Sequence, residues 1–436
     1  MPGRTTVRPC RAGASQLLAL HASDPAQFPH LLVSGGTGGR FDILFASPDA
    51  PRVLSPEASA AQVAAFFGDI ERHIVPGDPS PDTLPFTRGD FLYLGYELAG
   101  VFEPRLNMPA PRLPLALAQY CHAAIIHDHW RQETVVCADS EGLARTLAAQ
   151  AEGTQAKTFP AFCLPDIEEE DPERYLAGIA RIQDYIRAGD VFQVNLSRRY
   201  AAAIPRDLTG AQVMAALGAA NPAPFAALAT LGDAVVISAS PERLVKVRGR
   251  TIRTCPIAGT AARVTGEDEK IVCERLRNHP KERAEHIMLV DLERNDIGRI
   301  CMPGSVRVPS LMRMESYATV HHLVSTVEGT LRADASLREI LRSLFPGGSI
   351  TGCPKVRCME ILAELEGGPR GAYTGSLGYI NERGDMELNI LIRTAALEHG
   401  ALSWRVGGGI VADSDPGREL AETRAKAAGL LRAFGA

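Results

Sequence analysis

The sequence predicts an α+β protein in which antiparallel hairpins and helices occupy separate stretches of the chain. Strand-like runs crowd into 225–255, where Arg248-Gly249-Arg250 forms a plausible hairpin turn. Helical patterns gather at 267–293, 335–366 and 416–434 instead of alternating one for one with strands, so a parallel sheet is not expected. With 436 residues, of which 45% are hydrophobic and 22% charged, the chain can bury a large core.

Composition excludes several classes of partner. The net charge is −5 and acids and bases are mixed along the chain, so neither nucleic acid nor a membrane surface is an expected partner. No apolar run is long enough to cross a bilayer, and the N-terminus does not resemble a signal peptide. The nine cysteines are scattered and lack CxxC spacing. We therefore expect a cytoplasmic protein without a zinc site.

The first region, 1–160, is predicted to mix short strands with one alanine-rich helix. The expected strands lie at 41–45, 90–100, 115–124 and 132–138, and the expected helix at 56–73. The stretch 150–172 contains three prolines and ends in the acidic run 168–171, which marks the best candidate boundary.

The second region, 170–436, is predicted to hold most of the helices. The expected helices are 172–189, 267–278, 281–293, 335–344, 354–366 and 416–434. The expected strands are 191–196, 225–230, 234–238, 244–247, 251–255, 318–327, 375–381, 387–397 and 403–412.

Residues 345–366, FPGGSITGCPKVRCMEILAELE, combine a glycine-rich turn with the start of a helix. Lys355 and Arg357 fall in the first helical turn, where the helix dipole disfavours cations. Free backbone N–H groups and two cations together suit an anion. The alternative is an ordinary loop-to-helix junction with solvated basic side chains.

Two acidic pairs form a second constellation. Glu282 and Glu285 lie one turn apart in line with apolar leucines, and Glu419 and Glu422 share a helix face with Lys426. Carboxylates from two segments could supply the oxygen ligands that Mg²⁺ prefers. Solvated carboxylates at the edge of each apolar face are the alternative.

Two further motifs carry groups that can exchange protons. His321 and His322 are adjacent in a strand-like run, so at most one of them faces a given site. Glu242, in SPER at a strand end, could be a general acid or base or could cap a turn.

The order of these motifs resembles that of the chorismate-utilising enzymes, the family that includes anthranilate synthase and aminodeoxychorismate synthase component I and the isochorismate and salicylate synthases. The resemblance rests on FPGGSITGCPKVRCMEI, PIAGT, EHIMLVDLERNDIGR, HHLVS, GYIN, IRT and GGGIVADSDPGRELAETRAKA. It is dense from about Glu173 onward and implies two packed antiparallel sheets flanked by helices. RFDILFASP and GYEL in the first region look like the aminodeoxychorismate synthase branch.

The resemblance implies a role for each candidate residue in binding chorismate, a dicarboxylate with a 4-hydroxyl leaving group. It implies that Glu285 and Glu422 bind a Mg²⁺ directly. It also implies that Glu282 and Glu419 lie close to the metal and act through water. It implies substrate contacts at Gly259, Thr260, Tyr373, Arg393, Gly409 and Lys426. His322 matches the histidine that assists loss of the hydroxyl, and Glu242 matches the acid–base carboxylate at C4.

The expected nucleophile is ammonia. The resemblance implies that water-using relatives share a lysine that activates water, and this chain has Gln193 at that position. Ammonia-using members generally receive it from a glutamine amidotransferase subunit, which is therefore an expected partner. Many aminodeoxychorismate synthases carry a lysine where this chain has Ala258, and alanine is the anthranilate synthase pattern. FQVNLS, HHLVS, RFDIL and ELNILIRT nevertheless favour amination at C4, with Asn195, His321 and Asn389 expected to shape the pocket.

Two alternatives remain open on the sequence. One is amination at C2, the anthranilate synthase reaction. The other is a non-catalytic chain that binds tryptophan or a partner, for which Ser34 is a possible contact. Retention of the four carboxylates, His322, Arg393 and Lys426 argues against a non-catalytic chain.

Overall fold

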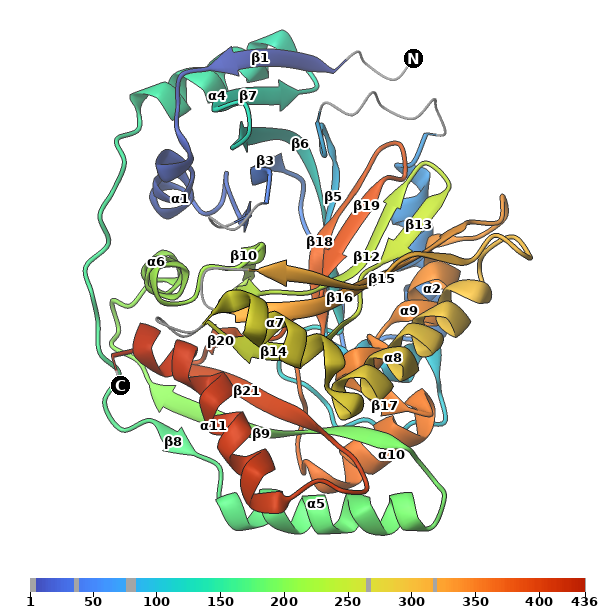
Figure 1. Cartoon of the computed structure of the whole chain (residues 1–436). Coiled ribbons are helices and arrows are strands. Elements are labelled where there is room, and N and C mark those ends of the chain that lie inside the picture. The colour runs from blue at the N-terminus through green and yellow to red at the C-terminus, as the bar shows by residue number, and fades with distance from the viewer. Residues whose placement is uncertain (1–4, 35–38, 76–83, 264–267, 317–319, 436) are drawn as a thin grey trace.

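The strands pair into one antiparallel ladder that folds back on itself (Figure 1). The structure is a computed structural model of the whole chain and describes residues 5–34, 39–75, 84–263, 268–316 and 320–435. One arm of the ladder contains, in order, β15 (Arg307–Ser316), β16 (Val320–Thr330), β13 (Thr251–Thr254), β12 (Arg243–Arg248), β19 (Met386–Asn389), β18 (Ser376–Asn381), β5 (Gly89–Leu94) and β6 (Ala116–Asp128), with β14 (Ile257–Ala262) also on β16.

The second arm continues from β6 through its pairing with β3. It contains β3 (Phe41–Pro48), β2 (His30–Val33), β10 (Phe225–Leu231), β11 (Ala234–Ser240), β20 (Thr394–Glu398), β21 (Ala401–Ile410) and β9 (Gln193–Ala203). Short strands extend its margins: β8 (Glu168–Glu169) and β17 (Gly352–Cys353) on β9, β4 (Arg52–Leu54) and β7 (Glu133–Ala138) on β6, and β1 (Thr6–Cys10) on β7.

The two arms pack face to face, which confirms the expected pair of packed antiparallel sheets. Phe91 and Tyr93 of β5 and Tyr379 of β18 share one buried cluster with Ala229 of β10 and Val236 of β11. Small side chains on the second arm leave room for the aromatic rings of the first, so the two faces interdigitate.

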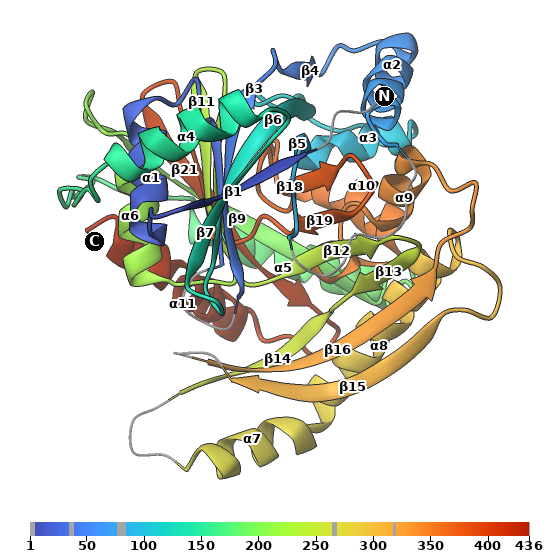
Figure 2. The ribbon, with the colours of Figure 1, turned by 90° about the horizontal axis from the view of Figure 1, so that it is seen from above.

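Helices cover the outer faces of both arms (Figure 2). The second arm is covered by α6 (Gly210–Ala220), α11 (Pro416–Ala433), α5 (Pro172–Arg187) and α10 (Lys355–Leu365). The first arm is covered by α2 (Ala60–Arg72), α8 (Pro280–Gly298) and α9 (Leu337–Leu344), with α7 (Glu269–Asn278) beside α8 along β14 and β16. The remaining helices are α1 (Ala14–Ser23) and α4 (Glu141–Gly153) near β6 and β7, α3 (Ala99–Phe102), and the 3₁₀ turns η1 (Tyr96–Leu98) and η2 (Gly348–Ile350).

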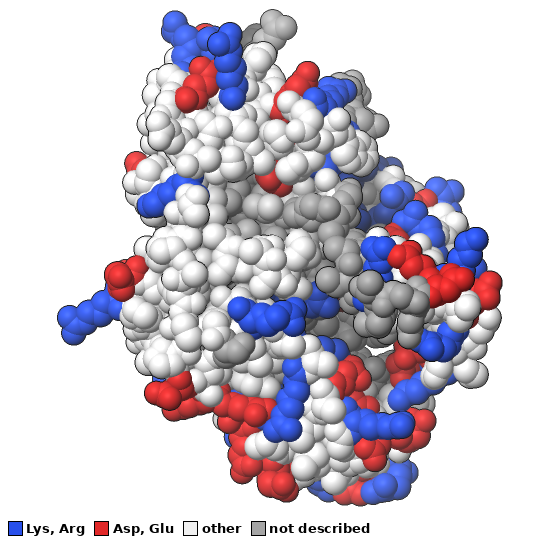
Figure 3. Space-filling view, turned by 60° about the vertical axis from the view of Figure 1, so that its left-hand side comes forward, with Lys and Arg blue, Asp and Glu red and all other residues white. Residues whose placement is uncertain are grey.

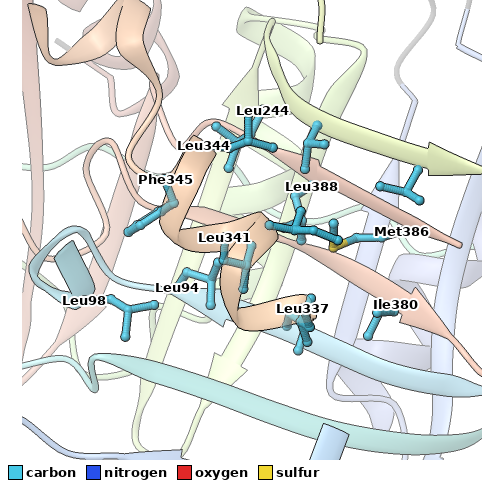
Figure 4. Packing of buried hydrophobic residues seen from close by; sticks show 14 of the residues in the cluster. Leu94, Leu98, Leu244, Leu337, Leu341, Leu344, Phe345, Ile380, Met386 and Leu388 are labelled. Carbon is cyan, nitrogen blue, oxygen red and sulfur yellow. The ribbon is translucent and has the colours of Figure 1, made fainter. Parts of the chain in front are cut away.

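Helix α9 shows how local sequence positions these layers. Ser336 and Glu339 form a reciprocal capping box at its N-terminus. Leu337, Leu341 and Leu344 follow at three- and four-residue spacing and point into a cluster with Leu94 and Leu388 (Figure 4). Fully burying one such leucine contributes about 1.5–3 kcal/mol, so this single face fixes α9 on the first arm.

The two regions expected from the sequence share one ladder. Strand β5 pairs with β18 over Leu94↔Ser376 to Gly89↔Asn381, and β2 pairs with β10. Segment 154–167, near the boundary expected between the two regions, contains neither helix nor strand. Strands before residue 160 thus complete the sheet of the second region.

The described helices include none that is both long and apolar enough to cross a membrane. On the face shown in Figure 3, acidic and basic side chains are interspersed over the lower half. The free cysteines are distributed over several elements, and most are buried or half-buried.

Candidate active site

Strand β21 and helix α11 place the first carboxylates of the site. Asp415 caps α11 by accepting from the backbone N–H of Arg418, and Pro416 occupies the first turn. The same first turn carries Glu419, whose Oε1 accepts a hydrogen bond of 2.7 Å from the hydroxyl of Ser414. The cap thus fixes the first acidic side chain beside the end of β21.

The four acidic candidates come together from α8 and α11. Burial is the largest of the effects that raise the pKa of Glu285 to about 6; the charges of Glu282, Glu419 and Glu422 also raise this pKa, and Lys281 lowers it. Burial also raises the pKa of Glu419, and Glu422 adds to this effect. The two pairs, more than 130 residues apart in the sequence, therefore lie within electrostatic reach of one another.

Two lysines border this acidic group. Lys426 Nζ lies 2.8 Å from Glu422 Oε1 and donates a 3.0 Å hydrogen bond to the carbonyl oxygen of Gly407, and Lys281 Nζ lies 3.9 Å from Glu285 Oε1. Among the described residues, no three His, Cys, Asp or Glu side chains gather as closely as metal ligands do. The donor chemistry, four carboxylates in a partly buried place, fits Mg²⁺.

Arg393 is a half-buried cation for which the described residues supply no anionic partner. It lies between β19 and β20 with φ of 52°, and no described acid forms an ion pair with it. Burial lowers its pKa. Burial likewise lowers the pKa of His322 to about 4, and the nearby Arg393 charge contributes. A half-buried guanidinium without an opposite charge is unfavourable, so this place suits an anionic ligand.

The PIAGT segment lies between α8 and β16. Gly259 has φ of +84°, and a Cβ there would be 3.1 Å from Glu282 Oε2. The backbone of Gly259 hydrogen-bonds with His322. His322 in β16 is paired across the sheet with Thr260 in β14. The Thr260 side chain is outside the described part of the structure. The Ala258 carbonyl lies 3.2 Å from His286 Nδ1.

Polar side chains of β9 face the glycines of β21. A Cβ on Gly409 would lie 2.0 Å from Gln193 Nε2, and one on Gly407 would lie 2.7 Å from the Tyr373 hydroxyl and 3.0 Å from Asn195 Oδ1. Gln193 Oε1 and Asn195 Oδ1 are buried, and neither has a hydrogen-bond partner in the described structure. Two acceptors without donors mark a place for an N–H-bearing ligand.

Tyr175 is a candidate site residue that sequence reasoning missed. In the sequence it is one apolar position on the α5 stripe. In the structure its hydroxyl is buried without a partner, 3.7 Å from where a Gly408 Cβ would stand. Burial and the charge of Glu419 raise its pKa well above its usual value. Only the glycine run of β21 hinted that a backbone approaches closely here.

Glu242 lies at the end of β11 against the glycine-rich turn. Burial raises its pKa to about 7, and the Ser349 hydroxyl donates a 2.8 Å hydrogen bond to its Oε1. The 345–366 stretch therefore contacts Glu242 through the hydrogen bond from Ser349.

The anion-binding interpretation of Lys355 and Arg357 is wrong. Lys355 Nζ binds Asp296 Oδ2 at 2.6 Å and two backbone carbonyls, and Arg357 binds Asp190 at 2.7 Å. The solvated-junction alternative also fails for Lys355, whose side chain is 14% exposed. Its charge is neutralised inside the protein.

Asn389 and His321, which are expected to shape the pocket, form hydrogen bonds with neighbouring segments. Asn389 donates to the carbonyl of Phe225 at 3.1 Å, and His321 Nδ1 lies 2.8 Å from the Ser316 hydroxyl. Asn389, Phe225 and Ser34 line a cavity of about 1010 Å³, and its lining includes none of the four carboxylates, Glu242, His322 or Arg393.

Comparison with known proteins agrees with the resemblance. A family described as chorismate binding enzyme matches residues 38–432. An anthranilate synthase component I-like protein of Synechocystis is 39% identical over 93% of this chain and 84% of its own length. Aminodeoxychorismate synthase component 1 of Klebsiella aerogenes is 40% identical over 88% of both chains. The crystal structure of anthranilate synthase component I from Streptococcus pneumoniae superposes with a TM-score of 0.79 at 28% identity, covering 92% of this chain and 94% of that one.

Proposed function

The chain belongs to the family of chorismate-binding enzymes, and we propose that it aminates chorismate at C4, the reaction of aminodeoxychorismate synthase component I. The observation that carries the choice of nucleophile is the pair of buried acceptors, Gln193 Oε1 and Asn195 Oδ1, beside Gly407 and Gly409. Ammonia brings N–H donors that satisfy such acceptors. An amide is a poor base, so Gln193 does not suit the activation of water.

Chorismate carries two carboxylates, and the site offers separate places for them. Arg393, which forms no ion pair with any described acid, suits one carboxylate. The resemblance adds Tyr373 and the backbone of Gly409 to the same place. Lys426, beside the four acids, suits the other together with Mg²⁺. When bound, Mg²⁺ would supply positive charge at the ring carboxylate as the hydroxyl departs.

Glu242 has the properties of the acid that protonates the departing 4-hydroxyl. With a pKa raised to about 7, a large share of this carboxyl is protonated at neutral pH. His322, with a pKa lowered to about 4, is a neutral imidazole at that pH and can assist by hydrogen bonding.

A glutamine amidotransferase subunit is the proposed source of ammonia. This proposal rests on the family resemblance and on the nucleophile inferred above. The isolated chain is then expected to use ammonium salts at alkaline pH and to use glutamine only when that subunit is added. Turnover of glutamine by the purified chain alone contradicts it.

Amination at C2 is the second candidate, and Ala258 favours it. Alanine at this position is the anthranilate synthase pattern, and relatives of both names are similar to this chain at 39–40% identity. The C4 proposal depends on the motifs FQVNLS, HHLVS, RFDIL and ELNILIRT.

The test supplies chorismate, Mg²⁺ and ammonium with and without an added aminodeoxychorismate lyase. We expect p-aminobenzoate only when the lyase is present. Fluorescent anthranilate formed without the lyase would establish the C2 reaction instead.

A further inference from the structure

Strand β14 contains a β-bulge within the PIAGT segment. Ile257 pairs with Val324 and Thr260 pairs with His322, so the register shifts between these two pairs and two residues of β14 oppose one of β16. Gly259, in the bulge, has φ of +84°, which glycine adopts without strain. A bulge takes backbone groups out of the ladder, and each buried group then needs another partner.

The bulge contacts both side chains to which the proposed function assigns a role at the departing hydroxyl. The backbone N–H of Ile257 donates a hydrogen bond to the Glu242 carboxyl. The backbone of Gly259 hydrogen-bonds with His322. Backbone groups of one three-residue segment therefore bind the acid and the histidine, and the position of this segment determines where both side chains lie.

His286, on α8, binds the middle of the bulge. The side chain is fully buried, and its Nδ1 lies 3.2 Å from the carbonyl oxygen of Ala258. Because a carbonyl oxygen only accepts hydrogen bonds, Nδ1 carries the proton of this one. The bond supplies the partner that a carbonyl in a bulge lacks within the ladder.

A second hydrogen bond fixes the orientation of the same imidazole ring. His286 Nε2 lies 2.5 Å from Ser325 Oγ, and the backbone N–H of Met312 donates to this oxygen at 2.9 Å. The Ser325 hydroxyl is left to donate to Nε2. The ring therefore donates through Nδ1 to β14 and accepts through Nε2 from β16.

Helix α8 contacts the bulge at two points. Glu282 lies one turn before His286 on the same helix face, and a Cβ on Gly259 would be 3.1 Å from its Oε2. His286 also directly follows Glu285 in the sequence. The hydrogen bond to Ala258 therefore connects the bulge to the helix that carries two of the proposed metal carboxylates.

We propose that His286 is a positioning residue, which holds the Ala258 carbonyl and thereby sets where Glu242 and His322 lie relative to the carboxylates of α8. This role rests on the proposed function, in which Glu242 protonates the departing hydroxyl and His322 assists. His286 does this without contacting chorismate and without exchanging a proton with it.

The proposal places the effect of His286 on the chemical step. A small displacement of Glu242 or His322 from the reacting atoms lowers the rate of that step. Arg393 and Lys426, the proposed partners of the two chorismate carboxylates, lie outside the bulge. A defect at His286 should therefore lower kcat and change KM for chorismate little.

The first test compares chorismate consumption, whatever the product, in H286A, H286N and H286Q. All three variants remove the ring, and thermal unfolding measures the stability that each loses. An asparagine amide extends to about the position of Nδ1 and can donate to Ala258, whereas a glutamine amide extends to about that of Nε2 and meets Ser325. We expect kcat to fall by on the order of 10–100-fold in H286A and H286Q, and H286N to recover most of this loss. Equal losses of kcat in H286N and H286Q overturn the proposal.

The second test depends neither on turnover nor on the proposed function. In protein carrying [¹⁵N]histidine, NMR identifies which nitrogen of His286 carries the proton, and the signals of His286 and His322 are assigned by their loss in H286N and H322N. We expect the proton on Nδ1, and we expect the His322 signals to shift in H286Q much more than in H286N. A proton on Nε2 alone, or His322 signals that do not move in H286Q, overturns the positioning role even if the enzyme consumes chorismate.

Discussion

Buried charges in this protein are of two kinds, and the difference marks the site. Arg370 and Glu366 pair at 2.7 Å, and Lys355 and Asp296 pair at 2.6 Å, so each neutralises its partner. Half-buried Arg393 and buried Glu242 form no ion pair with any residue that the structure describes. Unpaired ionisable groups in a protein interior are typical of functional sites. The sequence does not show which buried charges form ion pairs. For this reason it did not reveal that Lys355 binds Asp296 and not an anionic ligand.

The Glu242→Gln substitution tests the burial of this carboxyl through stability. A folded-state pKa of about 7, above the ordinary 4.5, means that the unfolded chain releases this proton first. The contribution of Glu242 to the free energy of unfolding is therefore highest below about pH 4.5. It falls between about pH 4.5 and pH 7 and no longer changes above about pH 7. We expect E242Q to be more stable than the unchanged protein at pH 8, by on the order of 3 kcal/mol, and equally stable at pH 4.

Urea unfolding at the two pH values measures this difference. Glu364→Gln, at a half-exposed carboxylate that accepts from Tyr185, is the control and should lack the pH-dependent gain. An E242Q protein that is less stable at pH 8 would show that Glu242 is stabilising as a carboxylate.

The Glu422→Gln substitution tests the proposed metal carboxylates. It keeps the shape of the side chain and removes one of the charges that α8 and α11 bring together. We expect Mg²⁺-dependent turnover to fall by about 10–100-fold, while the circular dichroism spectrum is unchanged. Glu274→Gln, at an exposed position on the neighbouring α7, should retain activity. Normal Mg²⁺ dependence in E422Q would remove Glu422 from the metal site.

At the scale of elements, the glycines of β21 hold β9 close. Gly407 and Gly409 face different neighbours: a Cβ on Gly407 would lie 2.5 Å from the backbone carbonyl of Leu196, whereas one on Gly409 would meet the Gln193 side chain. We expect Gly407→Ala to destabilise the fold by about 1–3 kcal/mol, because backbone must move. Gly409→Ala should leave stability nearly unchanged and lower ammonia-dependent turnover, since a flexible side chain is displaced from the site.

Thermal unfolding and turnover, measured on both variants, separate these outcomes. Equal stability losses in the two variants would contradict the assignment of Gly409 to the site.

Element prediction succeeded where the local pattern was strong. It failed at an edge strand and at a break, and it missed three helices, α1, α4 and α6. The α11 helix was expected at 416–434 from Asp415 and Pro416, and is found at Pro416–Ala433. Strand β15 was missed because only one of its ten residues is buried, so it lacks a clear apolar face. The single strand expected at 387–397 is two strands, β19 and β20, interrupted around Arg393, whose left-handed φ of 52° has no signature in an arginine.

At the scale of the molecule, the α+β class followed from hairpins and grouped helices, but the long-range pairing did not. Nothing local in the sequence shows that β5 pairs with β18 or β2 with β10. Those pairings join the regions on either side of residue 160. The same long-range folding brings carboxylates of α8 and α11 within electrostatic reach of one another. Spacing alone suggested that the two acidic pairs could share a metal, and the resemblance supplied the role of each carboxylate.

A fragment of residues 170–436 tests whether the first region completes the sheet. Without β5 and β2, strands β18 and β10 each expose an unpaired edge, and such edges promote aggregation. We expect the fragment to aggregate when produced alone and to become monodisperse by size-exclusion chromatography when residues 1–160 are co-produced. A stable, monomeric fragment would show that the second region folds independently.

The position of the incoming nitrogen tests the central claim most directly. The enzyme is given chorismate, Mg²⁺ and ¹⁵N-ammonium, and the product is examined by ¹³C–¹⁵N NMR before any lyase is added. We expect the nitrogen to be bonded to C4 of a product that retains the enolpyruvyl group. Nitrogen bonded to C2, or an aromatic product that has lost pyruvate, would contradict the account.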